Sequence, residues 1–398
     1  MLDVKTLKET REIVENICQN NIEMEIIQLS DALGRILAED IYSNKNIPGF
    51  TRSTVDGYCV KAEDVFGCTN SSVTLLKKIG NIKMGEFPTF CIESGQCAYI
   101  PTGGHIPEGA DSVVMIEQIE DYGDEIGVLK AVAPGTNMIF KGEDVKCGNL
   151  LFRKGTKVNS RNCGLLAACG ICKIKVYKKI KVIVVSTGNE LVEPGRELLD
   201  GQIYDVNGSM FEALLKECGC DVEFFGIIQD DRVDFEYILR SIIDRCDMVL
   251  LSGGTSVGIK DFTAEILQKM GTVLVHGIAV KPGKPTIIAD VARKIVFGLP
   301  GNPLAAFFIF HLVVKRAIDT MYRHCENYKI EKKILFSSIS SNHGREEYIP
   351  VRIKENAAYP ILGGSGLISL LKDAEGYIKI ARDTEGISKG TLVEVIYF

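Results

Sequence analysis

The chain has 398 residues, a formal net charge of −6 and 46% hydrophobic residues, the composition of a globular protein. Its length allows roughly two to four compact units. It contains no basic tract, which argues against nucleic acid as a partner. No apolar run reaches the roughly 18 residues of a membrane span. The charged N-terminus "MLDVKTLKETREIVENI" also lacks the apolar core of a signal peptide, so we expect a cytoplasmic protein with no membrane segment.

The N-terminal part of the chain mixes helix-like and strand-like segments. Apolar residues at helical spacing predict a helix over 5–20, and a second helix is predicted over 161–172. Between 27 and 146, short β-rich runs alternate with Gly/Pro turns, which indicates an inserted β-rich domain. The two helices could pack together, so that 1–26 and 147–178 form a helical linker or stalk.

From 179 to 327, strand-like runs alternate with helix-like runs. "IKVIVVS", "DVEFFGII" and "MVLLS" read as buried strands, and "PLAAFFIFHLVVKRAIDTMY" reads as a long apolar helix. This alternation favours a doubly wound, mostly parallel α/β sheet. Residues 328–398 return to β-rich texture and predict a small, β-barrel-like C-terminal domain. The expected fold class is therefore a multidomain α/β plus β protein.

Cysteine spacing argues against a metal site or a disulfide framework. Among the 13 cysteines, Cys169 and Cys172 form a C-x-x-C pair, and no second pair lies at zinc-site distance. The pair lies in the apolar, small-residue segment "RNCGLLAACGICKIKV". We interpret its thiols as buried and reduced.

Four Gly- or Pro-rich loops are expected at the edge where the parallel strands end, which is where open α/β sheets bind ligands. They read "VVSTGNEL", "LLSGGTSVG", "AVKPGKP" and "FGLPGNP". In "LLSGGTSVG", glycines let the backbone approach a bound group, and hydroxyl and free N–H groups favour an anion. The same loop could be only a tight turn, with Asp261 as the cap of the next helix. In "FGLPGNP", Asn302 suits a helix cap and Pro303 a first helical turn.

The segment "VKPGKP" places two cations next to these loops. Pro282 and Pro285 predict an extended, polyproline II conformation, which repeats every three residues. Lys281 and Lys284 would then project to the same side and suit phosphate or another oxyanion. The alternative is a pair of solvated lysines on a surface loop.

Acidic residues are expected near the same anion site. Glu190 and Asp261 lie in the edge loops, and Asp230 or Asp231 follows the second strand, where either could cap a helix. Carboxylates repel an anion unless a divalent cation bridges them, and Mg²⁺ is the usual partner of carboxylate and phosphate oxygens. This predicts a Mg²⁺-dependent reaction on a phosphorylated substrate.

Three further polar residues stand at glycine turns of the β-rich insert. Asp56 precedes Gly57, Thr102 precedes a Gly-Gly turn, and Asp144 follows a glycine in "KGEDVKCG". Each one also reads as an ordinary turn residue.

The ordered set of motifs resembles the molybdopterin molybdenumtransferase family of molybdenum cofactor biosynthesis, which includes the C-terminal domain of gephyrin. The resemblance covers essentially the whole chain and rests on "STVDGYCV", "PTGGHIPEGADSVV", "GEDVKCG", "VSTGNELVEPG", "LSGGTSVGIKDFT", "VKPGKPT", "LPGNP" and "GGSGLISLLKDAEGYIKI". The chain departs from it in three places. It reads S-T-V-D-G-Y-C where the family often reads S-A-M-D-G-Y-A, Thr51 stands where an acidic residue is common, and "AEGYIKI" replaces an A-N-G pattern.

The resemblance implies an elongated homodimer of four-domain subunits, in which the insert of one subunit faces the α/β cleft of the other. It implies that molybdate is inserted into adenylylated molybdopterin, with Mg²⁺ present and AMP released. Molybdopterin adenylyltransferase and molybdoenzyme apoproteins are further expected partners. A molybdopterin adenylyltransferase and a non-catalytic carrier or scaffold remain alternatives, and the choice between molybdate and tungstate is open.

The resemblance and the loop chemistry together give the expected site. The expected catalytic residues are Asp56, Thr102, Asp144, Glu190 and Asp261, with Glu190 and Asp261 also as metal ligands. The expected substrate-binding residues are Ser186, Thr187, Gly188, Asp230, Ser252, Gly253, Gly254, Ser256, Gly258, Lys281, Lys284, Pro300, Gly301, Asn302 and Pro303.

Overall fold

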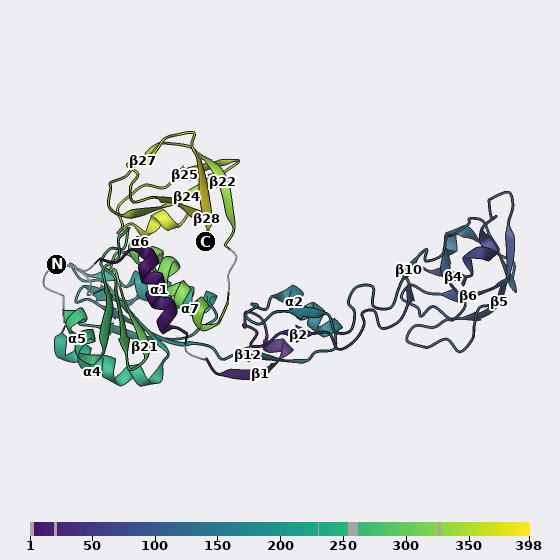
Figure 1. Cartoon of the computed structure of the whole chain (residues 1–398), viewed down its shortest axis with the longest axis horizontal. Coiled ribbons are helices and arrows are strands. Elements are labelled where there is room, and N and C mark those ends of the chain that lie inside the picture. Colours follow the sequence, from purple (N-terminus) through teal and green to yellow (C-terminus); the bar gives the residue numbers. More distant parts are fainter. Residues whose placement is uncertain (1–3, 20–21, 230, 254–261, 325–327) are drawn as a thin grey trace.

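The computed structural model describes residues 4–19, 22–229, 231–253, 262–324 and 328–398. It is elongated, with an α/β domain and a C-terminal barrel at one end, a distal β domain at the other, and a narrow stalk between them (Figure 1). The chain runs out along the stalk and back, so the distal domain is an insertion. The expected multidomain α/β plus β class is confirmed.

The α/β domain is built on a six-stranded sheet of order β16-β13-β17-β21-β20-β18. The first four strands are parallel, and β20 and β18 are antiparallel to their neighbours. The strands span Lys181–Thr187 (β13), Asp221–Ile228 (β16), Met248–Ser252 (β17), Thr272–His276 (β18), Ile287–Val291 (β20) and Lys294–Leu299 (β21). Strand β17 is buried at every position, as expected for the centre of a sheet covered on both faces.

Helices cover both faces of this sheet, so it is doubly wound as predicted. Residues of α3 (Val206–Glu217), α6 (Pro303–Ile309) and α7 (Lys315–Met321) share one core with one face of the sheet. Residues of α4 (Arg232–Ile242) and α5 (Phe262–Met270) share a second core with the opposite face. The predicted long apolar helix is present, but a π-helical turn at Phe310–Val314 separates α6 from α7.

The first helix does not pack as expected. Helix α1 (Leu7–Ile17) begins with a capping box between Thr6 and Glu9 and packs against α7, with Leu7 and Val14 in the core of the α/β domain. Helix α2 (Ser160–Ala168) instead belongs to a separate small core in the stalk. The prediction that the two helices pack together is wrong, because the apolar face of α1 is buried by the α/β domain.

The stalk is held by short antiparallel pairings between the outgoing and returning chain. Strand β1 (Met24–Gln28) pairs with β12 (Lys173–Tyr177), and β2 (Ile41–Tyr42) pairs with β11 (Leu150–Phe152). Residues 27–42 therefore lie in the stalk and not with the distal sheet. The C-x-x-C thiols are only partly as expected, since Cys169 is buried but Cys172 is exposed.

The distal domain lies between β2 and β11 and contains a six-stranded sheet of order β7-β4-β6-β5-β9-β8. Its strands span Gly57–Val60 (β4), Thr74–Asn81 (β5), Gln96–Ile100 (β6), Ser112–Met115 (β7), Ile119–Asp121 (β8) and Glu125–Val128 (β9). A short pair, β3 (Arg52–Ser53) with β10 (Met138–Ile139), lies outside this sheet.

The C-terminal domain is a closed five-stranded barrel, because β24 pairs with both β25 and β26 and the remaining strands complete the ring. Its strands span Ile330–Leu335 (β22), Glu346–Lys354 (β24), Ala357–Pro360 (β25), Gly376–Ile380 (β26) and Leu392–Tyr397 (β28). A short strand from the α/β domain, β19 (Val280–Lys281), pairs with β24 and joins the two domains. Within the described ranges, no helix combines the length and apolarity needed to cross a bilayer.

Candidate functional site

The four predicted loops leave the sheet at one edge. Strands β13, β17 and β21 are parallel, and β18 points the same way because it is separated from β21 by one antiparallel strand, β20. After β13 the chain crosses to one side of the sheet, and after β17 it crosses to the other. These two strands therefore flank the topological switch point, where open α/β sheets bind ligands.

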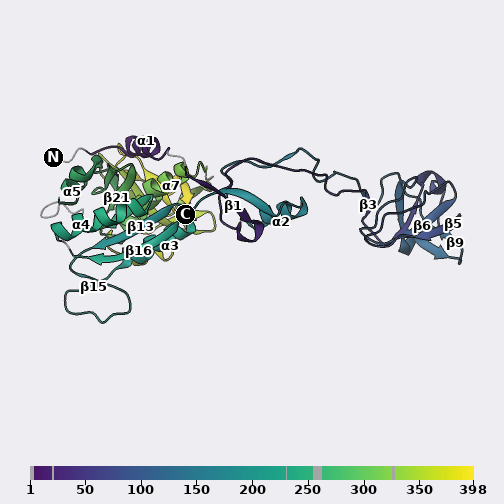
Figure 2. The same ribbon diagram turned by 90° about the horizontal axis from the view of Figure 1, so that it is seen from below.

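A cavity of about 710 Å³, here called the cleft cavity, opens at this switch point. Eight of the expected site residues line it: Thr187, Glu190, Ser252, Gly253, Pro300, Gly301, Asn302 and Pro303. The segment that carries β14 (Leu191–Val192) and β15 (Ile203–Tyr204) projects from the domain and lines the cavity as well (Figure 2). Its contribution could not be predicted from the sequence, since its apolar side chains carry no catalytic motif.

Gly253 lets two of the loops touch. Its φ of +92° favours glycine, and a Cβ built there would lie 2.4 Å from the carbonyl oxygen of Thr187. No other residue fits without moving one of the two backbones. The bare glycine after β17 therefore sets how closely the β13 and β17 loops approach each other.

A buried amide that the sequence analysis missed ties two loops together. Asn207, at the start of α3, is 5% exposed and lines the cleft cavity. Its Nδ2 donates to Ser252 Oγ at 2.9 Å, to Gly301 O at 2.9 Å and to Pro300 O at 3.5 Å. The amide thereby fixes the β21 loop against the end of β17. In the sequence, "YDVNG" reads only as a helix start, which hid this role.

Two more buried polar atoms are present here. Asp205 caps α3 by accepting a hydrogen bond from Gly208 N at 3.0 Å, and its Oδ2 is buried without a hydrogen-bond partner. Ser186 is fully buried, and its Oγ likewise has no partner. Ser186 therefore lies beneath the cavity surface, in register with Ser252.

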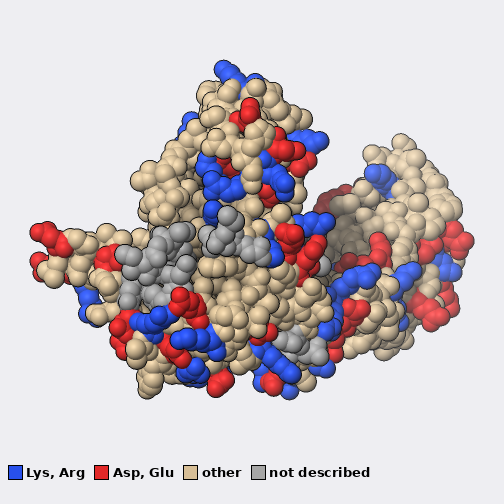
Figure 3. All heavy atoms as spheres, turned by 60° about the vertical axis from the view of Figure 1, so that its left-hand side comes forward, with Lys and Arg blue, Asp and Glu red and all other residues tan. Residues whose placement is uncertain are grey.

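A second cavity of about 410 Å³, here called the lysine cavity, adjoins the first and shares Pro285, Pro300 and Asn302 with it. Lys281 and Lys284 line it together with Arg345 of the barrel, a cation that the sequence analysis missed. Lys and Arg side chains lie on the part of the barrel that faces the α/β domain (Figure 3).

One of these cations is already neutralised in part. Lys281 Nζ lies 2.8 Å from Glu347 Oε1, whereas Lys284 is exposed. Burial and a hydrogen bond to Glu346 raise the pKa of Tyr348, so this cavity-lining phenol stays a neutral group.

The predicted conformation of the lysine segment is wrong, although both lysines line one cavity. Gly283 has a φ of +115°, which polyproline II does not allow, and the Lys281–Pro282 peptide is cis. A Cβ at Gly283 would lie 2.5 Å from the side chain of Ile309, so the segment folds back against α6. Packing against the helix, and not proline stiffness, places the two cations.

Asn302 also differs from its expected role. It is the N-cap residue of α6, with Pro303 in the first turn, but its side chain makes no capping hydrogen bond. Its Nδ2 donates instead to Ser365 Oγ at 3.0 Å. The "LPGNP" loop is thereby tied to the C-terminal "GGSG" motif, far away in sequence.

The expected residues of the distal domain do not reach the cleft of their own chain. Asp56 Oδ1 accepts a hydrogen bond from Thr102 N at 2.7 Å, so these two form a pair, and Asp144 is exposed nearer the stalk. The stalk separates the distal domain from the α/β domain (Figures 1 and 2).

The remaining expected residues have separate outcomes. Asp230, Gly254, Ser256, Gly258 and Asp261 lie outside the described residues. Gly188 is not among the residues that line the cleft cavity. Asp231 caps α4 by accepting hydrogen bonds from Val233 N and Asp234 N, so it has the helix-capping role that the sequence also allowed.

The acidic residues of the cleft fit a divalent cation. Glu190 is exposed toward the cleft cavity, and the unpartnered Oδ2 belongs to a second cavity-lining carboxylate, Asp205. Mg²⁺ needs only one or two carboxylates when phosphate oxygens and water complete its shell. Among the described residues no cluster of three or more potential ligands is present, so the protein alone does not form a closed metal cage.

Comparison with known proteins defines the family. The chain matches the MoeA N-terminal region (domain I and II) over 5–170, the probable molybdopterin binding domain over 183–320 and the MoeA C-terminal region (domain IV) over 333–398. The chain therefore belongs to the MoeA family of molybdopterin biosynthesis proteins, as the motif resemblance predicted.

Individual relatives agree with this assignment. The chain is 30% identical to a molybdopterin molybdenumtransferase of Staphylococcus epidermidis, covering 99% of this chain and 96% of the relative. It is 38% identical to one of Haemophilus influenzae, covering 74% and 72%. The crystal structure of a molybdopterin biosynthesis MoeA protein from Pyrococcus horikoshii OT3 superposes with a TM-score of 0.87 at 32% identity, covering all of both chains.

Proposed function

We propose that this protein is a molybdopterin molybdenumtransferase, which inserts molybdate into adenylylated molybdopterin and releases AMP. The carrying observation is the full-length match to transferases of that name, combined with a cavity at the switch point of the α/β sheet and an adjoining cavity toward the barrel. The protein is expected to act in the cytoplasm and to hand its product to molybdoenzyme apoproteins.

The two adjoining cavities divide the substrate between them. Lys284 and Arg345 attract the phosphate groups, while Lys281 is held toward the site by Glu347. Hydroxyl and backbone groups of Thr187, Ser252 and Gly253 surround the adjoining cleft cavity, which holds the phosphate-bearing tail of the pterin. The shared wall at Pro300 and Asn302 then lies next to the phosphoanhydride.

Glu190 and Asp205 are the described residues that would hold Mg²⁺, with Asp261 as a further proposed ligand. Bound Mg²⁺ would neutralise phosphate charge and favour cleavage of the phosphoanhydride bond. Glu190 orients the water that attacks the phosphate, and the cations of the lysine cavity hold the departing AMP. Molybdate is the co-substrate, and soft thiolate sulfur atoms of the pterin are its ligands in the product.

The distal residues join the site through a second copy of the chain. Asp56, Thr102 and Asp144 are exposed and remote from their own cleft, which supports a homodimer in which they face the partner's cleft. Each complete site would then contain the cleft of one subunit and the distal domain of the other.

The decisive test supplies the purified protein with adenylylated molybdopterin, Mg²⁺ and molybdate and measures AMP release together with reconstitution of an apo-molybdoenzyme. Coupled AMP and cofactor formation is expected. Adenylyl transfer from ATP to molybdopterin would instead identify an adenylyltransferase, and tight binding of the substrate without turnover would identify a carrier. A parallel reaction with tungstate measures the oxyanion preference.

A further inference from the structure

The distal domain contains a cavity of about 680 Å³ that no step above uses, here called the distal cavity. Phe87 and Phe140 line it and are 75% and 50% exposed. His105, also in its wall, stacks on Phe50 with ring centroids 4.5 Å apart and meets the edge of Phe87 at 4.6 Å. Aromatic side chains gathered this openly around a hollow mark a recognition surface.

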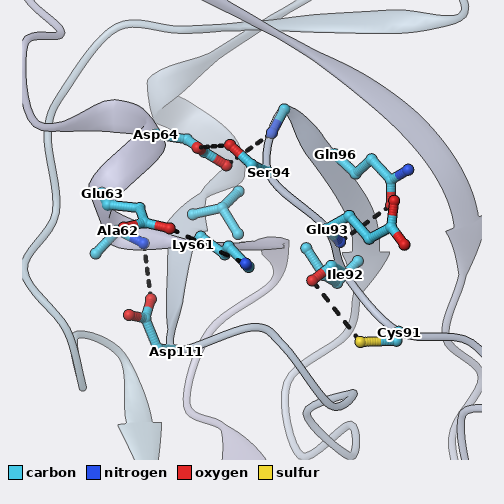
Figure 4. A network of polar contacts seen from close by, with 12 residues as sticks. Lys61, Ala62, Glu63, Asp64, Cys91, Ile92, Glu93, Ser94, Gln96 and Asp111 are labelled. Atoms are coloured by element: carbon cyan, nitrogen blue, oxygen red, sulfur yellow. Dashed lines mark hydrogen bonds and ion pairs between the residues drawn. The ribbon is translucent and has the colours of Figure 1, made fainter.

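The wall of the distal cavity is fixed in place by polar contacts. Asp111 Oδ1 accepts a hydrogen bond from Ala62 N at 2.7 Å (Figure 4), and Ile92 N, next to the lining residue Cys91, donates to Glu108 O at 2.8 Å. Gly109 has a φ of +87°, and a Cβ there would lie 2.2 Å from Ile92 O. The segments on either side of the hollow are therefore locked together, so the cavity is preformed.

The charge of the distal cavity is opposite to that of the lysine cavity. Its lining includes the carboxylates Glu108 and Asp111 and contains neither Lys nor Arg among the described residues. Burial lowers the pKa of His105, which keeps that ring neutral. Acidic and aromatic walls repel phosphate but accept a flat ring that carries N–H groups, because the ring stacks on phenylalanine and its amine donates to a carboxylate.

Backbone hydrogen bonds connect the distal cavity to the turn that carries Thr102. Gly103 N donates to Ser53 O at 2.8 Å, and Ser53 N donates to Gly104 O at 3.0 Å. Between the same two segments, Ile106 N donates to Thr51 O at 3.0 Å, and both of these residues line the distal cavity. The turn that carries Thr102 and the wall of the distal cavity therefore belong to one hydrogen-bonded pair of segments.

We propose that the distal cavity binds the flat, amine-bearing heteroaromatic ring at one end of the substrate whose phosphate groups occupy the cleft of the second subunit. This inference rests on the proposed function and deepens it by assigning a recognition site to the distal domain. Adenine and the pterin ring share the required chemistry, and the choice between them is an outcome of the test. Direct burial of the phenylalanines against the second subunit is the competing outcome.

The test compares a double variant, Phe87→Ala with Phe140→Ala, with the control Phe66→Ala. Phe66 lies in the same domain and is 61% exposed, but it is not part of the distal cavity. Binding of AMP, molybdopterin and adenylylated molybdopterin is measured for each protein, with thermal unfolding and sedimentation as controls. The double variant is expected to bind the ring-bearing ligand about tenfold more weakly. The control and the ring-retaining variant Phe87→Tyr should bind like the unaltered protein.

The three ligands identify the ring. Weaker binding of AMP assigns adenine to the distal cavity, and weaker binding of molybdopterin assigns the pterin. Unchanged binding of all three ligands by the double variant, or its dissociation to monomers in sedimentation, would overturn the inference. Turnover by the unaltered protein reports separately on the proposed function, so each of the two can fail without the other.

Discussion

The cleft of the α/β domain and the turns of the distal domain hold their polar residues in different ways. In the cleft, the buried Asn207 donates to the buried Ser252 Oγ and to the carbonyl oxygen of Gly301, so the loops are fixed by one chain. In the distal domain, Asp56 and Thr102 contact each other on an exposed turn. The cleft is therefore preformed within one subunit, whereas in the proposed homodimer the distal residues act against a second surface.

The largest expected effect comes from the preformed half. Glu190→Gln removes the charge of a carboxylate that lines the cleft cavity and keeps its shape. Because Glu190 is exposed and bridges no core residues, we expect an unchanged unfolding temperature and a loss of turnover of at least about 100-fold. AMP release at saturating substrate measures this. Near-normal turnover would remove Glu190 from the catalytic set.

A mixing experiment tests whether the two halves come from different subunits. Asp56→Asn and Glu190→Gln should each be nearly inactive alone. If the site is shared across a two-fold dimer, unfolding and refolding an equal mixture should restore about a quarter of the normal activity, because half of the dimers carry one intact site. A mixture that stays as inactive as its components would mean that each subunit acts alone.

A smaller effect is expected when the loop clamp is removed. Asn207→Ala leaves Ser252 and Gly301 without their shared donor, so the two loops lose their fixed spacing. We expect KM for adenylylated molybdopterin to rise about tenfold, with a smaller change in kcat. The matched control is Asn159→Ala, which removes the N-cap of α2 in the stalk. It should cost stability but leave KM unchanged, and equal effects of both variants on KM would contradict a positioning role.

The smallest effect on turnover is expected at His311, which instead gives the α/β domain a dependence of stability on pH. Burial lowers the pKa of His311 from 6.5 to about 3, and its Nε2 is buried without a partner. The unfolded chain therefore binds a proton between these values while the folded chain does not. The free energy of unfolding should fall as the pH drops from 6.5 toward 3, by up to about 1.4 kcal/mol per pH unit. Urea unfolding of the protein and of His311→Leu measures this, and an identical slope for the two would exclude His311 as the cause.

Several features could be predicted because they depend on local pattern. The apolar runs around Val184 and Leu250 identified the central strands, and the glycines and prolines after them identified the edge at which the cleft cavity opens. Other features could not. Helix α1 packs against the α/β domain because that domain has an apolar surface that no other described element covers. The side chain of Asn302 bonds to Ser365, which lies 63 residues away in sequence. Asn207 and Arg345 were missed for the same reason, since each joins the site through distant contacts.

By itself, the sequence determined the classes of element, their order and the family, because hydrophobic period and turn residues act over a few neighbouring positions. Only the tertiary structure decided which polar groups meet. It folded the lysine segment against α6 through Gly283, brought Arg345 of the barrel to the lysine cavity, and placed Asp56 and Thr102 beyond the reach of their own cleft. Such meetings depend on the packing of whole domains, and no local stretch of sequence encodes that packing.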